Sequence, residues 1–289
     1  MILTDTHCHL DFDKFDADRA DVLLRAQQAG VARILIPGTS WTSSLSAVKL
    51  AESHPMLFAA IGVHPTETSN VERRTSGIGY STLDAFRDLA CNPKVIAIGE
   101  IGLDYYWDAA PHDLQQRVLR EQLDLAADLE LPVVIHCREK GDAADGPCAS
   151  DLMKVLEEWA NRLGRGKSPL AERPGVLHSF SGRRETAQRA IGLNFYIGVT
   201  GPVAYRKDRQ ELIASLPLEH LLIETDAPYL TPSPLRPSPG GRGEGVRVRN
   251  EPAFVRLIAD KIAALHSCSP EQAAAVTSAN AQRLFGWKD

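Results

Sequence analysis

The sequence predicts an α/β protein built as a single (β/α)8 TIM barrel over residues 1–289. Eight short apolar or β-branched runs begin roughly 20 to 40 residues apart, and helical patterns lie between them. The length of 289 residues is also ordinary for one such barrel. An open, doubly wound parallel sheet is the alternative, but eight strand–helix units favour the closed barrel.

The predicted strands are short, and each ends at a polar residue or a turn. They cover residues 2–6, 32–36, 57–61, 95–98, 133–136, 175–178, 194–197 and 221–225. Helical patterns lie at 18–29, 114–129, 151–163 and 183–191, and the pattern at 114–129 repeats apolar residues at about a 3.6-residue period. Three irregular segments, 66–80, 139–149 and 231–249, follow strands, which places them over the carboxyl-terminal mouth of a barrel.

The composition is that of a soluble globular protein, with 44% hydrophobic and 24% charged residues. No apolar run approaches the length of about 20 residues that spans a bilayer, and no basic-then-apolar segment opens the chain. The five cysteines form no CxxC pair, which suits a reducing compartment. We therefore expect a cytoplasmic protein without a membrane partner, and a monomer by default.

Charge is distributed unevenly along the chain. The net charge of −5 does not favour a nucleic-acid-binding protein. Residues 181–250, however, hold ten basic and seven acidic groups, so that this segment carries +3 and the remainder −8. A local basic zone is compatible with a polyanionic ligand, and equally with solvated charges on loops.

Histidines and carboxylates stand at the ends of six predicted strands. His7 and His9 follow the first strand two residues apart, so both imidazoles share one face of an extended chain. The later strands end at His64, Glu100, His136, His178 and Asp226. Each histidine alone is as well explained as an ordinary structural residue, but in a barrel all six strand ends meet at one mouth.

Ionisable side chains gathered at one mouth predict a bound cation, because isolated buried charges are unfavourable. The donors are nitrogen and oxygen atoms without a thiolate set, which suits zinc, manganese, iron or magnesium. One ion takes roughly four to six ligands, and seven candidate residues exceed that number. The pattern therefore predicts two divalent ions (Mg²⁺, Mn²⁺ or Zn²⁺) that share Glu100 as a bridging carboxylate.

Eight sequence blocks extend this pattern over nearly the whole chain. They are TDTHCHLD at 4–11, GVHP at 62–65, GEIGLDYY at 99–106, LPVVIHCR at 131–138, HSFSG at 178–182, ETDAP at 224–228, RNEP at 249–252 and NAQRLF at 280–285. In content and order they resemble the TatD-type metal-dependent deoxyribonucleases, a family of the amidohydrolase superfamily with a (β/α)8 barrel. The resemblance implies that His7, His9, Glu100 and Asp226 hold one metal ion. It implies that Glu100, His136 and His178 hold the second, with His64 beside the site to help hold a substrate phosphate.

From this resemblance we expect hydrolysis of DNA phosphodiester bonds by a metal-activated water. The expected enzyme is a 3′–5′ exonuclease that prefers single-stranded ends and serves DNA repair. Asp226, at the end of the last strand, would orient or deprotonate the water as well as bind metal, with Glu100 and His64 as further catalytic residues. His64 and Arg138 would offset charge on the DNA. Tyr105 would stack on a base, or else pack on a neighbouring loop.

Two other functions are compatible with parts of the pattern. A two-metal hydrolase could act on another ester, such as aminoacyl-tRNA, a lactone or a phosphotriester, because fold alone does not determine substrate. A non-catalytic scaffold that kept the barrel is disfavoured, since no ligand position of the family pattern is replaced.

Overall fold

Eight parallel strands form one sheet in the order β1 to β8. The computed structural model of the protein describes residues 1–69, 82–235 and 248–287. The strands are β1 Leu3–Asp5, β2 Val31–Pro37, β3 Leu57–Ile61, β4 Val95–Asp104, β5 Val133–Arg138, β6 Gly175–Leu177, β7 Tyr196–Val199 and β8 Leu221–Ile223. Each strand pairs in parallel with its neighbour in the sequence, which confirms the predicted (β/α)8 fold class.

Hydrogen bonds join the segments that follow β1 and β8, at the carboxyl-terminal ends of these two strands. Thr6 N–H donates to Ile223 O at 3.1 Å, Asp226 N–H to His7 O at 2.9 Å, and His9 N–H to Ala227 O at 2.8 Å. These bonds close the sheet at its carboxyl-terminal end, the edge on which the βα loops of a barrel carry functional residues.

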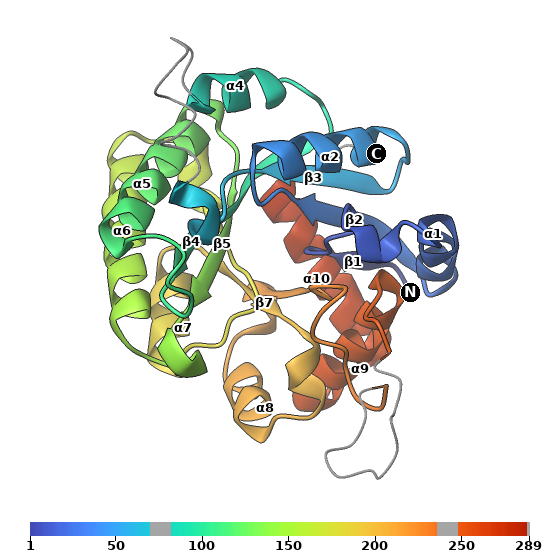
Figure 1. The fold of residues 1–289 in the computed structure, drawn as a ribbon. Helices are drawn as coiled ribbons and strands as arrows, with labels where there is room; N and C mark the ends of the chain where they lie inside the picture. Colours follow the sequence, from blue (N-terminus) through green and yellow to red (C-terminus); the bar gives the residue numbers. More distant parts are fainter. Residues whose placement is uncertain (70–81, 236–247, 288–289) are drawn as a thin grey trace.

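Helices cover the outside of the barrel (Figure 1). They are α1 Arg19–Gln28, α2 Trp41–Glu52, α4 Thr82–Leu89, α5 His112–Leu129, α6 Pro147–Arg165, α7 Arg184–Gly192, α8 Lys207–Ala214, α9 Val255–Leu265 and α10 Pro270–Phe285. Their buried faces form a layer with the outward-facing strand residues, such as Ile34 and Ile135. The segment predicted as irregular at 139–149 ends earlier than expected, because Pro147 begins α6, a position that proline favours.

The barrel interior is filled by a separate apolar cluster. Val134, Val176 and Leu222 belong to it, and Phe285 and Trp287, at and after the end of α10, pack into the same cluster. Because these side chains fill the interior, a site for chemistry is left at the mouth rather than along an open channel.

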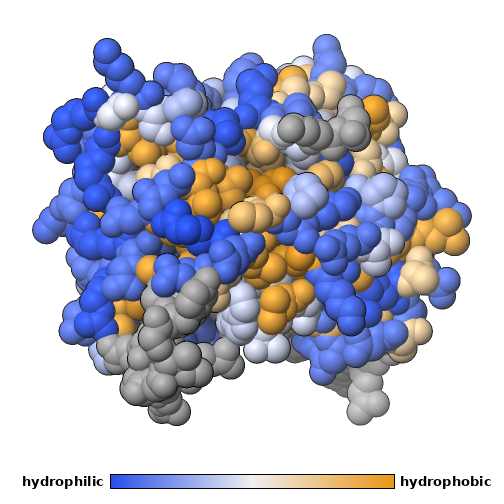
Figure 2. All heavy atoms as spheres, turned by 90° about the horizontal axis from the view of Figure 1, so that it is seen from above, coloured by the Kyte–Doolittle hydropathy of each residue, from blue (hydrophilic) through white to orange (hydrophobic). Residues whose placement is uncertain are grey.

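The surface view in Figure 2 shows hydrophilic residues over most of one face, with hydrophobic residues gathered across its middle. Among the described residues, no helix is both long enough and apolar enough to cross a bilayer.

Candidate metal centre

Four side chains from three parts of the barrel converge at the mouth. His7 Nε2 and His9 Nε2 lie 3.3 Å apart. Glu100 Oε2 lies 3.5 Å from His7 Nε2 and 3.8 Å from His9 Nε2. Asp226 Oδ1 lies 3.9 Å from His7 Nε2 and 3.5 Å from His9 Nε2. The structure therefore brings both histidines directly against Asp226, as adjacency of the first and last strands predicts.

These distances suit one cation bound by all four side chains. Four ligands about 2.0–2.2 Å from an ion at the centre of a tetrahedron would lie roughly 3.3–3.6 Å from one another, and the five distances found here run from 3.3 to 3.9 Å. Two imidazole nitrogens and two carboxylate oxygens also match the ligands that divalent zinc or manganese accepts. The residues present thus fit a metal ion at this first cluster (His7, His9, Glu100, Asp226).

Glu100 reaches the centre because its strand is irregular. The pairing of β4 with β5 shifts register between Ile98 and Ile101, and such bulges re-aim a side chain. The Glu100 backbone N–H donates to Gly38 O at 2.8 Å. This local break in β4 turns Glu100 inward, where each of its two oxygens faces a different set of histidines.

The second cluster gathers around the other oxygen of Glu100. His136 Nδ1 lies 2.9 Å from Glu100 Oε1, His64 Nε2 lies 3.8 Å from it, and His178 Nε2 lies 3.9 Å from it. His64, Glu100 and His136 form one group with ligand spacing, and His178 is grouped with His7 and Glu224. The arrangement is consistent with Glu100 as the shared carboxylate of two cation positions, which stays a prediction.

Strand alternation places the histidines of β5 and β6 over the interior core. His136 is two residues after Val134, and His178 is two residues after Val176, so each continues the inward-facing row of its strand. Glu224 follows Leu222 in the same way on β8. One layer of polar side chains therefore sits directly above one layer of apolar side chains.

Two carboxylates that the sequence-based site did not include hold the outer nitrogens of these histidines. His136 Nε2 lies 2.9 Å from Asp104 Oδ2, and His178 Nδ1 lies 2.9 Å from Glu224 Oε1. Metal-binding histidines typically carry such a carboxylate on the nitrogen that faces away from the ion. The sequence could have indicated both carboxylates by their positions. Asp104 lies four residues after Glu100, and Glu224 lies two residues before Asp226, within the same sequence blocks.

Within the described ranges, the buried Nδ1 atoms of His7 and His9 have no hydrogen-bond partner. His178 Nδ1 also lacks a hydrogen bond of good geometry but has the Glu224 carboxylate 2.9 Å away. His7 instead stacks on His178 with ring centroids 3.4 Å apart, and His9 stacks on Phe12 at 4.6 Å. Asp226 sits in the left-handed conformation at φ 54°, which aspartate tolerates. Ring packing therefore orients His7 and His9, and the backbone conformation orients Asp226, toward the first cluster.

The hydrogen bonds of His64 favour a donor role over a ligand role. Its Nδ1 accepts from the backbone N–H of Thr66 at 3.3 Å and lies 2.7 Å from the Thr66 hydroxyl, which can donate to the same nitrogen. In this tautomer Nε2 carries the proton of a neutral ring. Burial lowers the pKa of His64 to about 3, and the neighbouring His136 adds to this effect. A neutral His64 with an Nε2–H directed at the second cluster can donate to a phosphate oxygen, the role that the family resemblance implies and that stays a prediction.

The charges of the centre are strongly coupled. Burial by itself raises the pKa of Glu100, but His7 and His136 hold that pKa well below its usual range. Burial opposes the charge on His136, yet Asp104 and Glu100 raise its pKa to about 10. In the same way Glu224 overcomes burial and raises the pKa of His178 to about 9. Protons on these imidazoles therefore occupy the place that a cation would take.

The expected base contact by Tyr105 is corrected by the structure. Tyr105 is only 3% exposed, its ring stacks on His112 at 3.5 Å, and its hydroxyl donates to Asp151 at 2.9 Å. No stacking face remains for a nucleobase, so Tyr105 packs the β4 loop against α5 and α6. Sequence reasoning left this open, because burial depends on helices that follow later in the chain.

Arg138 lies at the end of β5, as expected, but with neighbours of its own. Its Nε donates to Asp142 at 2.8 Å, and its guanidinium lies 3.8 Å from the ring centre of Tyr106. The adjacent Trp107 is exposed. A contact of Arg138 with substrate stays a prediction.

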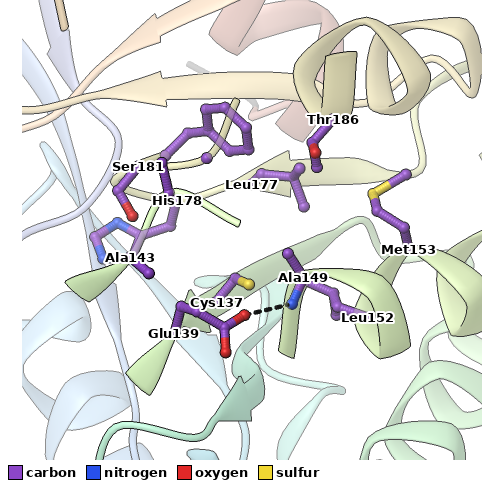
Figure 3. Close-up of a pocket in the computed structure, with 13 residues that line it drawn as sticks. Cys137, Glu139, Ala143, Ala149, Leu152, Met153, Leu177, His178, Ser181 and Thr186 are labelled. Atoms are coloured by element: carbon purple, nitrogen blue, oxygen red, sulfur yellow. Dashed lines mark hydrogen bonds between the residues drawn. The ribbon is translucent and has the colours of Figure 1, made fainter. Parts of the chain in front are cut away.

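A small cavity lies beside His178, between β5–α6 and β6–α7 (Figure 3). Its wall includes Leu177 and Met153, and Glu139 accepts a hydrogen bond from the Ala149 N–H at 3.2 Å at its edge. The cavity volume of ≈ 20 Å³ is room for about one water molecule. This cavity is therefore too small to receive a nucleobase.

Comparison with known protein families shows the family to which this chain belongs. The family model TatD related DNase matches residues 4–286. The chain belongs to the TatD-related DNase family. It is similar to the 3′-5′ ssDNA/RNA exonuclease TatD of Escherichia coli K12, with 37% identity over 286 residues and 98% of each chain covered. It is also similar to the uncharacterized metal-dependent hydrolase YabD of Bacillus subtilis, with 35% identity over 287 residues, 98% of this chain and 99% of the relative.

Solved structures agree with membership of the TatD family. The TatD homologue YJJV from Escherichia coli K12 has a TM-score of 0.79 and 32% identity, with 98% of both chains covered. An organophosphorus hydrolase from Deinococcus radiodurans, at a TM-score of 0.63 and 14% identity, shares the fold alone. The predicted TatD-type family and a metal-dependent hydrolytic nuclease are thereby confirmed.

Proposed function

We propose that this TatD-family nuclease removes nucleotides from the 3′ ends of single-stranded DNA with two divalent cations bound at the mouth. The convergence of His7, His9, Glu100 and Asp226 within 3.3–3.9 Å carries the proposal. The relative from Escherichia coli is named a 3′-5′ ssDNA/RNA exonuclease, which supports the polarity and the single-stranded substrate.

The cations would be held by two overlapping sets of residues. His7, His9, Glu100 and Asp226 form the first set, and Glu100, His136 and His178 form the second. Divalent cations in such a site neutralise the scissile phosphate and lower the pKa of a water molecule toward neutrality. The barrel would hold these side chains in place around the two cation positions.

Asp226 is the carboxylate best placed to receive the proton of the attacking water. Its side chain is 15% exposed, against 4% for Glu100 and 0% for Glu224. Burial by itself raises its pKa, but hydrogen bonding to His9 and the charges of His178 and His7 lower the pKa below its usual range. A carboxylate that is ionised at neutral pH and reaches the solvent can act as general base.

His64 and Arg138 would bind the negative charge of the substrate. His64 Nε2–H can donate to a non-bridging phosphate oxygen, and Arg138 can pair with the phosphate of the next nucleotide. Neither group needs to gain or lose a proton for this purpose. The predicted monomeric state, cytoplasmic location and role in DNA repair complete the proposal.

The direct test is a product ladder from single-stranded DNA labelled at the 3′ or the 5′ end, with Mg²⁺, Mn²⁺ or Zn²⁺ in separate arms. We expect the 5′-labelled strand to shorten stepwise and the 3′ label to be released at once. An RNA strand of the same sequence, an aminoacyl-tRNA, a lactone and a phosphotriester complete the substrate panel. Turnover of one of the last three with intact DNA would overturn the proposal.

The His136→Ala variant tests the second cation position. Removal of one ligand and of the partner of Glu100 should abolish cleavage of DNA while circular dichroism reports an unchanged fold. His54, half-buried in the turn before β3 and outside both clusters, offers a matched control in His54→Ala. Full activity of His136→Ala with saturating metal would contradict the two-cation assignment.

A further inference from the structure

An aromatic ring stands in the open beside the first cluster. Tyr229 lies three residues after Asp226, and 43% of it is exposed. Its backbone N–H donates to Asp226 O at 2.9 Å, and its carbonyl accepts from the buried Asn250 side chain at 2.5 Å. Both bonds anchor the Tyr229 backbone to the turn that carries Asp226, so the ring is presented at a fixed place relative to the centre.

Two neighbours define the surroundings of this ring. Phe12 stacks on His9, and Tyr229 meets Phe12 at 6.4 Å and His9 at 6.5 Å between ring centroids, both nearly edge-on. The Lys14 ammonium lies 4.6 Å from the centre of the Tyr229 ring, and Lys14 itself is exposed. The first cluster is therefore flanked by an exposed aromatic ring with an exposed ammonium group next to it.

We propose that Tyr229 is the stacking platform for a nucleobase of the substrate, and that Lys14 pairs with the phosphate beside that base. This inference rests on the proposed nuclease function. Aromatic faces stack on every base, so such a platform binds single strands without a sequence preference. The Tyr229 ring centroid lies 6.5 Å from that of His9, so we place a phosphate at the cluster and the base of the same nucleotide on Tyr229.

The platform also explains a preference for single-stranded ends. A base can lie on Tyr229 only when it has left its own stack and its pairing partner, which costs free energy in a duplex and little in a single strand. The cavity beside His178 holds about one water and cannot serve the same purpose. Trp107, on the β4 side of the mouth, is the competing platform because it is also exposed.

Steady-state kinetics on a short single strand test the platform. Tyr229→Ala should raise KM by about 10-fold or more, the usual scale for loss of one base–aromatic contact, with kcat and bound metal close to wild type. Tyr229→Phe should keep the wild-type KM because the ring face remains. Leu24→Ala, at an exposed position on α1, controls for loss of surface apolar area. A rise in KM for Trp107→Ala with none for Tyr229→Ala would overturn the assignment.

An abasic substrate separates stacking from structural damage. With one abasic site on either side of the scissile phosphate, the wild-type KM should rise at one of the two positions, and Tyr229→Ala should add nothing there. An equal effect of Tyr229→Ala on all substrates would reject stacking.

Lys14→Gln should reduce the slope of log KM against log salt by about one unit. If the wild type cleaves no polynucleotide, the nuclease function fails. If it cleaves and Tyr229→Ala equals wild type, only the platform fails.

Discussion

His136 has a carboxylate at each of its two ring nitrogens. Glu100 faces Nδ1 and Asp104 faces Nε2, both at 2.9 Å. Asp104 is itself held, because its other oxygen accepts from the backbone N–H groups of Tyr106 and Trp107. The imidazole thus has one orientation in which the inner nitrogen can bind a cation while the outer nitrogen donates to Asp104.

The Asp104→Asn variant should weaken metal binding at the second cluster by roughly 10- to 100-fold, the usual effect of losing the partner of a ligating histidine. The amide keeps an oxygen for the backbone N–H groups but presents an NH₂ group to His136 Nε2. Isothermal titration with Mn²⁺ measures the change. The exposed Asp108→Asn on the same loop is the control, and an unchanged affinity in Asp104→Asn would contradict the role.

Strand β7 contributes to the site through the absence of a side chain. A Cβ at Gly198 would lie 2.4 Å from Glu224 Oε1, the oxygen that faces His178 Nδ1 and accepts from the Ser179 N–H at 2.5 Å. A glycine in β7 therefore lets β8 place a buried carboxylate behind a histidine of β6. Three neighbouring strands cooperate in aiming His178.

Gly198→Ala should lower kcat by at least about tenfold, the order expected when a histidine loses its carboxylate partner. The added methyl group displaces Glu224 and costs about 1–3 kcal/mol of folding stability, which leaves a folded protein. Gly192→Ala is a matched control, since no atom beyond its chain neighbours and its own helix backbone lies within 4 Å of its Cβ position. Normal activity of Gly198→Ala would show that Glu224 does not position His178.

At the scale of the whole molecule, the first cluster lies where the chain closes on itself. His7 and His9 follow β1, Asp226 follows β8, and the backbone bonds between these segments close the sheet. A cation at this cluster would cross-link the two ends of the barrel. Ligand binding to the folded state alone raises stability by mass action.

Metal at about 100 times its Kd should therefore raise Tm by roughly 5–10 °C, which corresponds to about 3 kcal/mol. The gain should grow as pH rises from about 6.5 to 9. In the metal-free protein the pKa values of His136 and His178 are raised to about 10 and about 9. Their protonation stabilises the metal-free fold fully below pH about 6.5, and this contribution is lost as pH rises through those pKa values.

Because the same protons compete with a cation, metal binding strengthens over the same pH range. Differential scanning fluorimetry with EDTA or Mn²⁺ at several pH values measures both effects. In His136→Gln, which lacks one of the two competing protons, the metal-induced gain in Tm should depend less steeply on pH. A gain in Tm that stays flat or falls with pH would contradict the linkage.

The sequence by itself determined the strand–helix alternation, the fold class and the seven residues that converge on the centre. Each of these is encoded locally, in an apolar run and the polar residue that ends it. The tertiary structure decided which nitrogens face Glu100, which carboxylates hold His136 and His178, and which aromatic ring remains open. Tyr105 is buried by α5 and α6, whereas Tyr229 is left exposed beside Asp226. The physical reason is that burial and hydrogen-bond partners come from segments distant in the chain, which a linear pattern does not bring together.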